Sequence, residues 1–287
     1  MCGALRVGHR TRWVLVFQKQ RPKHLMDAVT LTTASGVDLF AMLGTVLWHV
    51  LRIGAALQAL PMIGGRSIPA RARLLVAVAI AAALSSLLPA PPAAAVDAAT
   101  VLNVVREFAI GIAIGLMLRI AFEAGQIAGE LVSQGMGLSF ATLANPLSDA
   151  ASPVLSQWFY LAFGMVFFAL DAHLALVHLL LDSYRALPIG APIADVQGFL
   201  ATVPEFFGTA LRAGVLLALP VMMALLAGNL AFGVLARAAA QLNPMSLGLP
   251  VSLLVGLVLL MLLARELLGP VQALIGQAFS AARAVTG

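Results

Sequence analysis

The residues best suited to metal or acid–base chemistry in this sequence are the closely spaced Asp171, His173 and His178. On a helix the two histidines do not share a face, and no third ligand follows at the spacing of a metal site. The sequence contains no HExxH or GxSxG pattern, no aspartate pair of an intramembrane protease and no phosphate-binding loop. Cys2 is the only cysteine, which leaves no disulfide framework and no cysteine-based metal site. We therefore expect no enzyme, no cofactor and no metal, and interpret Asp171 and His173 as a helix cap or a local polar contact.

A second group of polar residues recurs every three or four positions within an apolar region. Glu123, Gln126, Glu130 and Gln134 fall on one face of a helix, and Arg119 is spaced to pair with Glu123. Hydrocarbon cannot solvate such a stripe. The stripe therefore either packs against polar groups of neighbouring helices or lines an aqueous path, and the sequence leaves both alternatives open.

Glycines interrupt the same stretch of sequence. Gly125, Gly129, Gly135 and Gly137 precede a turn signal at Asn145-Pro146. Two pairs of glycines four residues apart, Gly111 with Gly115 and Gly125 with Gly129, are typical of closely packed membrane helices. We expect helix packing from Gly111, Gly115, Gly125, Arg119 and Glu123. The candidates for a pore or plug are Gly129, Glu130, Gln134, Gly135, Met136, Gly137, Leu138, Ser139, Phe140, Asn145 and Pro146.

The amino-acid composition indicates whether water or lipid surrounds the folded chain. It has 287 residues, of which 61% are hydrophobic and only 10% are charged, and its mean hydropathy is +1.00. A soluble domain has about 25% charged residues. The apolar runs are continuous rather than alternating, which favours membrane helices over a β-barrel. The sequence therefore predicts an all-α polytopic membrane protein.

The apolar runs predict about six hydrophobic helices, at roughly 39–60, 73–90, 100–122, 154–181, 207–236 and 249–268. Charges within or beside these runs need partners or a position near a helix end. They are Arg52, Arg106, Glu107, Arg119, Glu123, Glu130, Asp171, His173, Arg212, Arg237, Arg265 and Glu266.

The net charge of +5 arises from the beginning of the chain. Residues 1–25 carry six basic residues and no acid, which leaves 11 basic and 12 acidic residues in the remainder. The body of the chain therefore gives no support for nucleic-acid binding. We set residues 1–37 apart as a basic leader that is disordered, resembles a signal sequence or lies on anionic lipid, or that precedes the true start at Met26, and we favour the last interpretation. Residues 38–270 form the membrane domain, and 271–287 a C-terminal tail.

Four ordered segments carry a resemblance to a known family. The central one runs from Gly129-Glu130-Leu131 through Gln134 and Gly135-Met136-Gly137-Leu138-Ser139-Phe140-Ala141-Thr142 to Asn145-Pro146. The others are Arg52 with Pro61 and Ile68-Pro69, then Leu187-Pro188-Ile189-Gly190, and finally Leu219-Pro220, Asn229-Leu230, Arg237, Gln241-Leu242 and Gly248-Leu249-Pro250. Over about residues 38–270 the chain resembles the FliR/SctT family of type III export-gate membrane proteins, and its motif residues are most similar to those of FliR.

The resemblance implies a structural channel subunit in the flagellar basal body of a bacterial inner membrane. It implies a FliP-like portion followed by a FliQ-like portion, built from helical hairpins. The implied partners are FliP-like and FliQ-like gate subunits, an FlhB-like switch protein and unfolded export substrates, with no nucleic acid. The Gly-rich segment from Gly129 to Pro146 would be a plug, closed by Met136 and Phe140.

The sequence departs from the family pattern in the basic leader, at Ala239-Ala240 and at Asn243-Pro244-Met245. An injectisome export component of the SctT type shares the family plan and is an alternative. A small-solute secondary transporter is a second alternative, and would require inverted repeats that the sequence does not display.

Overall fold

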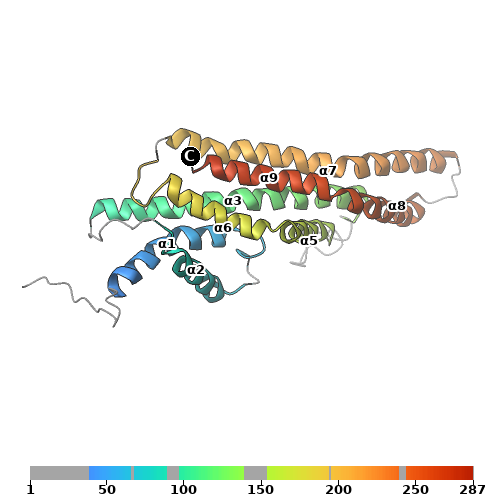
Figure 1. Ribbon diagram of the computed structural model, residues 1–287. Helices are drawn as coiled ribbons and strands as arrows, with labels where there is room; N and C mark the ends of the chain where they lie inside the picture. Colours follow the sequence, from blue (N-terminus) through green and yellow to red (C-terminus); the bar gives the residue numbers. More distant parts are fainter. Residues whose placement is uncertain are drawn as a thin grey trace, which may run out of the picture. The chain divides into compact units, whose positions relative to one another are not determined.

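A computed structural model describes residues 39–65, 68–88, 97–138, 154–193, 195–238 and 244–286. The leader predicted at residues 1–37 lies outside these ranges. The chain divides into residues 1–42 and 43–287, and the packing below concerns the second unit. All regular secondary structure in the described ranges is α-helical (Figure 1). The helices are α1 (Leu39–Ala59), α2 (Ala70–Leu84), α3 (Ala98–Gly135), α5 (Val154–Ala169), α6 (Ala172–Ala186), α7 (Val196–Ala238), α8 (Pro244–Glu266) and α9 (Leu268–Ala284).

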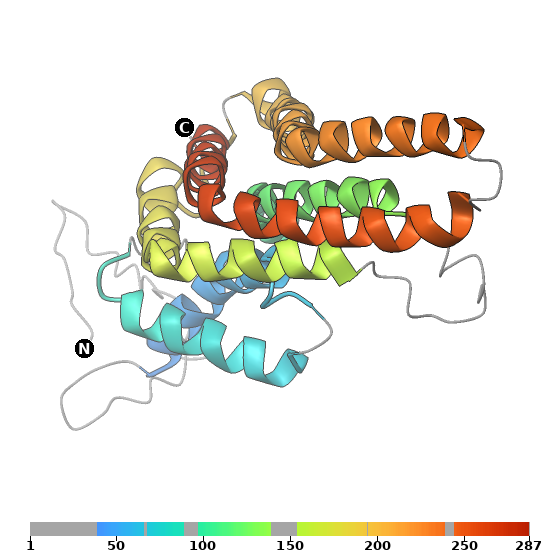
Figure 2. The same ribbon diagram turned by 90° about the vertical axis from the view of Figure 1, so that its right-hand side faces the viewer.

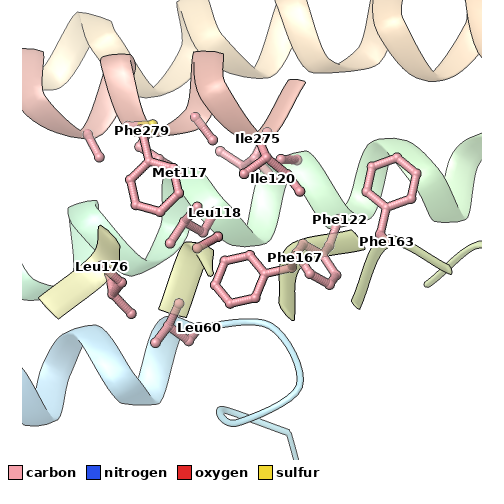
Figure 3. Close-up of a cluster of buried hydrophobic side chains, with 14 of the residues drawn as sticks. Leu60, Met117, Leu118, Ile120, Phe122, Phe163, Phe167, Leu176, Ile275 and Phe279 are labelled. Atoms are coloured by element: carbon pink, nitrogen blue, oxygen red, sulfur yellow. The ribbon is translucent and has the colours of Figure 1, made fainter. Parts of the chain in front are cut away.

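Helix α3 is the centre of the packing, because α5, α7 and α9 all lie against it. Phe122 of α3 makes edge-to-face contacts with Tyr160, Phe163 and Phe167 of α5, at centroid distances of 5.5 to 6.0 Å. Figure 3 shows this aromatic group continuing into aliphatic side chains that include Ile275 of α9. Aromatic pairs in this geometry add about 0.5–1.5 kcal/mol each beyond the burial of their area.

The predicted all-α membrane architecture is confirmed, and the number of spans is refined. Three helices in the described ranges are long and apolar enough to cross a bilayer, namely α1, α3 and α7. The number rises to five if each of two bent pairs, α5 with α6 and α8 with α9, forms one span. Helix α2, predicted as a span at 73–90, has only 15 residues and is too short to cross about 30 Å of hydrocarbon.

The two bent pairs turn sharply at short breaks. Helices α5 and α6 meet at 70°, where Asp171 adopts a left-handed conformation with a φ of 52°. Asp tolerates this conformation better than most residues. Helices α8 and α9 meet at 59° around Leu267, and Figure 2 shows the turn between them. The span predicted at 154–181 is therefore bent within its length, whereas the span predicted at 249–268 corresponds to α8 and ends at the second bend.

Two predicted boundaries differ from the structure. Helix α3 does not end near residue 122, and Gly125 and Gly129 lie inside it without interrupting it. The residues from 271 onward, predicted to form a C-terminal tail, belong to α9 and to the buried core. Val271, Leu274 and Phe279 of α9 are buried, because α9 is amphipathic and packs its apolar face on α3 and α7.

Candidate functional site

The polar stripe predicted from the sequence lies along α3, where Arg119 and Gln134 are exposed and Glu123, Gln126 and Glu130 are half-buried against the described residues. The guanidinium of Arg119 lies 3.5 Å from the carboxylate of Glu123, and their side chains are 53% and 43% exposed. Gln126 donates a hydrogen bond to Glu123 at 3.2 Å, and Gln134 donates one to Glu130 at 3.1 Å. The stripe therefore satisfies part of its hydrogen bonding along its own helix, and its remaining polar capacity faces outward.

A pocket of about 380 Å³ opens beside the N-terminal half of the stripe. Its polar lining comes from Arg119, Glu123 and Gln126 of α3 and from Gln157 and Tyr160 of α5. The loop after α1 forms the opposite wall, where the Tyr160 hydroxyl accepts a hydrogen bond from the backbone N–H of Met62. Water or a polar group of a neighbouring chain can occupy such a pocket, whereas acyl chains would leave these side chains unsolvated.

The end of α3 is a Schellman motif, which fixes the direction in which the chain leaves the stripe. Gly137 is left-handed with a φ of 78°. Its N–H donates to the carbonyl of Gln134 at 3.0 Å, and the N–H of Leu138 donates to the carbonyl of Ser133 at 3.1 Å. This pattern is the usual termination of a helix by glycine.

The plug candidates occupy different environments. Gly129, Glu130, Gln134 and Gly135 are within α3. Met136 is buried and points toward α8, where a Cβ added to Gly256 would lie 2.5–2.6 Å from its side chain. Leu138 is half-buried. The other candidates, Ser139, Phe140, Asn145 and Pro146, lie outside the described residues.

The glycines predicted for helix packing lie at close approaches to other helices. A Cβ on Gly125 would lie 2.7 Å from the ring of Phe163. One on Gly129 would lie 2.6 Å from backbone atoms of Leu155 and Ser156 in α5. Gly111 and Gly115 face α1, where added Cβ atoms would meet the carbonyl oxygens of Arg52 and Ala56. These positions allow backbones to approach more closely than any larger residue permits.

A buried polar cluster, absent from the predicted site, joins α1, α3 and α6. The guanidinium of Arg52 in α1 donates two hydrogen bonds to the carboxylate of Glu107 in α3, at 2.8 and 2.9 Å. It also donates to the hydroxyl of Ser183 at 3.1 Å and to the carbonyl of Leu187 at 2.8 Å. Arg52 is fully buried and Glu107 is 1% exposed. This bidentate arrangement is the strongest form of an arginine–carboxylate contact.

The ring of Tyr184 lies against the Arg52 cation. The Tyr184 ring lies 4.1 Å from the guanidinium carbon, a cation–π distance. The Tyr184 hydroxyl donates to the carbonyl of His49 at 2.9 Å, and the two rings meet edge to face at 5.0 Å. The only signal for this cluster in the sequence was that Arg52 and Glu107 are charges in apolar runs and therefore require partners.

Asp171 and His173, the residues best suited to chemistry in the sequence, have surroundings that are typical of neither a catalytic site nor a metal site. Asp171 is exposed at the N-terminal end of α6 and makes no side-chain capping hydrogen bond. His173 contacts the ring of Phe168 at a centroid distance of 5.6 Å. In the part of the chain that the structure describes, no three His, Cys, Asp or Glu residues are grouped so that they could hold a metal ion.

The long apolar helices, together with the Arg52–Glu107 pair that neutralises two charges within the helical core, define the chain as a multi-pass α-helical membrane protein. A family model described as bacterial export proteins, family 1, matches residues 43–278, so the chain belongs to that family. It is 36% identical over 218 residues to the flagellar biosynthetic protein FliR of Escherichia coli K12, covering 76% of this chain and 83% of the relative.

Two further relatives show how far the similarity extends. The FliR protein of Pectobacterium carotovorum is 32% identical over 231 residues, which cover 80% of this chain and 88% of that protein. The FliR protein of Bacillus subtilis is 29% identical over 230 residues, which cover 78% and 86%. The matched family region contains the stripe of α3 and the Arg52–Glu107 pair.

Proposed function

We propose that this chain is a structural channel subunit of the flagellar type III protein export gate in the bacterial inner membrane. It co-assembles with FliP-like and FliQ-like subunits, contacts an FlhB-like protein and helps to conduct unfolded flagellar proteins. Membership of the export family carries the general part of this proposal. The flagellar assignment, in preference to an injectisome, rests on the relatives described above, each of which is a flagellar biosynthetic protein.

The lengths of the helices support a place within a larger assembly. At 1.5 Å per residue, α3 and α7 would extend about 57 and 65 Å if straight, well beyond the roughly 30 Å of bilayer hydrocarbon. In a protein surrounded only by lipid, the apolar surface of these helices beyond the bilayer would be exposed to water. Neighbouring subunits would bury that surface.

The uncovered surfaces of the chain support co-assembly further. One face of α7 packs on α3, whereas Leu211, Leu219, Leu226, Leu230 and Val234 are exposed. On α3 the two ends of the stripe, Arg119 and Gln134, are exposed and the residues between them are half-buried, and the polarity of these side chains disfavours contact with acyl chains. The single observation that supports the channel role best is this outward-facing polar stripe, because it requires either a polar partner or water.

The plug is part of the same proposal. We place it in the segment that leaves α3 at Gly137 and extends to Pro146, since Met136 and the preceding candidates are held in or against the helical core. The Schellman motif gives this segment a fixed origin at the end of the polar stripe. Gly137 at its start permits the backbone to turn without steric cost.

Affinity isolation in mild detergent tests the assembly. The full chain with a C-terminal tag is isolated from its own cells, and the co-purifying proteins are identified by mass spectrometry. We expect FliP-like, FliQ-like and FlhB-like proteins in stable amounts. Isolation of the chain alone, under conditions that preserve the rest of the basal body, would contradict the proposal.

Ion leakage tests the plug. Residues 139–146 are replaced by a glycine–serine segment of equal length, which leaves α3 and the contact of Met136 with α8 untouched. We expect ions to leak through the assembled gate. A membrane that stays tight while the variant still co-purifies with its partners would contradict the plug and leave the assembly proposal standing.

A further inference from the structure

The contact between α1 and α3 is made by a repeated pattern of small residues. Gly111 faces the Arg52 carbonyl and the Ala55 side chain, and Gly115, one turn later, faces the Ala56 carbonyl and the Ala59 side chain. An added Cβ on either glycine would lie 2.8 Å from the alanine Cβ that it faces. Both helices thus repeat their contact surface every four residues.

Such a repeat does not define its own register. If α1 slid by one turn, one of the two glycines would still face small residues: Gly111 would face Ala56 and Ala59 in one direction, and Gly115 would face the Arg52 backbone and Ala55 in the other. Close packing of glycine and alanine therefore supports more than one position of α1 along α3. Other interactions must select the observed position. The Tyr184 hydroxyl on the His49 carbonyl and the Met62 N–H on Tyr160 contribute single hydrogen bonds, whereas Arg52 contributes four hydrogen bonds and a buried charge.

We infer that the Arg52–Glu107 pair fixes the register of α1 on α3. A slide by four residues would move the Arg52 side chain about 6 Å along the helix axis, which breaks both hydrogen bonds to Glu107. It would also withdraw the guanidinium from Ser183 and from the Leu187 carbonyl. Both charges would then be buried without a partner, the arrangement that a protein interior disfavours most strongly.

The pair also links this register to the second half of the chain. Leu187, whose carbonyl accepts from Arg52, ends α6 and begins the connection to α7. The same guanidinium therefore sets α1 against α3 and the start of the α6–α7 connection against both. Selecting one register among several apolar alternatives is the best-attested role of a single buried polar group.

Distance measurements between spin labels test this inference. Cys2 is replaced by Ser, and labels are placed on cysteines at the exposed positions Leu47 of α1 and Val101 of α3. The background is either the native pair or R52M/E107M, which removes both charges and leaves apolar side chains of similar length. A second label pair at Val101 and the exposed Phe207 of α7 does not involve α1 and serves as the control.

With the native pair we expect one narrow distance distribution for labels at positions 47 and 101. With R52M/E107M we expect the protein to accumulate to within about twofold of the native level, since apolar pairs replace buried ion pairs without loss of folding. Its 47–101 distribution should gain a second population shifted by up to about 6 Å, one helical turn, while the 101–207 distribution stays unchanged.

Two outcomes would overturn the inference. One is a single, unshifted 47–101 distribution in R52M/E107M, because packing alone would then set the register. The other is failure of R52M/E107M to accumulate, because the small-residue contact would then be unable to hold α1 in any position. Neither outcome bears on whether the chain co-purifies with gate subunits, so the inference and the proposed function are tested separately.

Discussion

Arg52 and Glu107 are 55 residues apart in the sequence and form a two-bonded ion pair from which solvent is excluded. Their geometry predicts that either single substitution, R52M or E107M, is strongly destabilising, since each leaves one buried charge without its partner. We expect a loss of about 3–5 kcal/mol, measured as reduced thermal stability in detergent and reduced steady-state amount. R52K, which keeps the charge and loses the fork of donors, should fall between the native protein and R52M. Equal stability of R52M and native protein would contradict the role of the pair.

Gly129 is predicted to be intolerant of any side chain. G129A places a methyl group 2.6 Å from the backbone of α5, so α3 and α5 must separate, at a cost of about 1–3 kcal/mol. Gly276 of α9 offers a matched control, because it is also helical, is exposed and has nothing within 4 Å of an added Cβ. G276A should be neutral or slightly stabilising through its helix propensity. Thermal unfolding in detergent compares the two, and similar melting temperatures would refute the packing argument.

Gly137 is predicted to be required for its backbone conformation rather than for its size. G137A forces an alanine into the left-handed region at a cost of about 1–2 kcal/mol, and it weakens the motif that directs the chain out of α3. G137N should be tolerated better, because asparagine adopts this conformation more readily. The checks are thermal stability and ion leakage of the assembled gate. Identical behaviour of the alanine and asparagine variants would argue against a conformational role.

Much of this architecture could be predicted from the sequence, and particular residues explain the remainder. Continuous apolar runs predicted α1 over 39–60, and the structure has it at Leu39–Ala59. Asp171, interpreted as a cap or local contact, marks the break between α5 and α6. Gly125 and Gly129 suggested an interrupted helix, because each glycine destabilises an isolated helix by about 1 kcal/mol relative to alanine. The structure has a continuous helix at both positions. Here close packing on Phe163 and on the α5 backbone offsets that cost.

The candidate site was predictable only where its pattern is local. The stripe of α3 follows from helical periodicity, and the structure places Arg119 beside Glu123 and Gln134 beside Glu130. Partners that are distant in sequence, such as Arg52 and Glu107, cannot be matched from one sequence. Several charged residues lie within apolar runs, and each of them could be the partner of another. The core position of α9 was missed because its amphipathic pattern resembles neither a span nor a loop.

Asp97 gives the chain a predicted pH dependence outside the membrane-spanning helices. Its carboxylate caps α3 by accepting a hydrogen bond from the backbone N–H of Thr100 at 2.8 Å, and this bond lowers the pKa of Asp97 below its usual value. A lowered pKa in the folded state means that the cap stabilises α3 above the ordinary pKa of Asp and is lost as the pH falls through the lowered pKa. The protection factor of the Thr100 amide, which compares its exchange rate with the intrinsic rate at the same pH, should therefore fall in acid.

Asn at position 97 provides the control for this pH effect. D97N retains an oxygen acceptor and does not titrate, so the protection factor at Thr100 should be intermediate and should not fall in acid. D97A should show little protection at any pH. Persistence of the acid-dependent fall in D97N would show that another group controls the N-terminal end of α3.

The most direct test of the proposed role is to identify which molecules contact the α3 stripe in the assembled export apparatus. A photo-crosslinking amino acid replaces Gln134, which is exposed at the end of the stripe, and cells are irradiated with the export apparatus assembled. The account predicts adducts with sister gate subunits or with a stalled export substrate. Adducts with lipid alone, from an assembly that is otherwise intact, would contradict it.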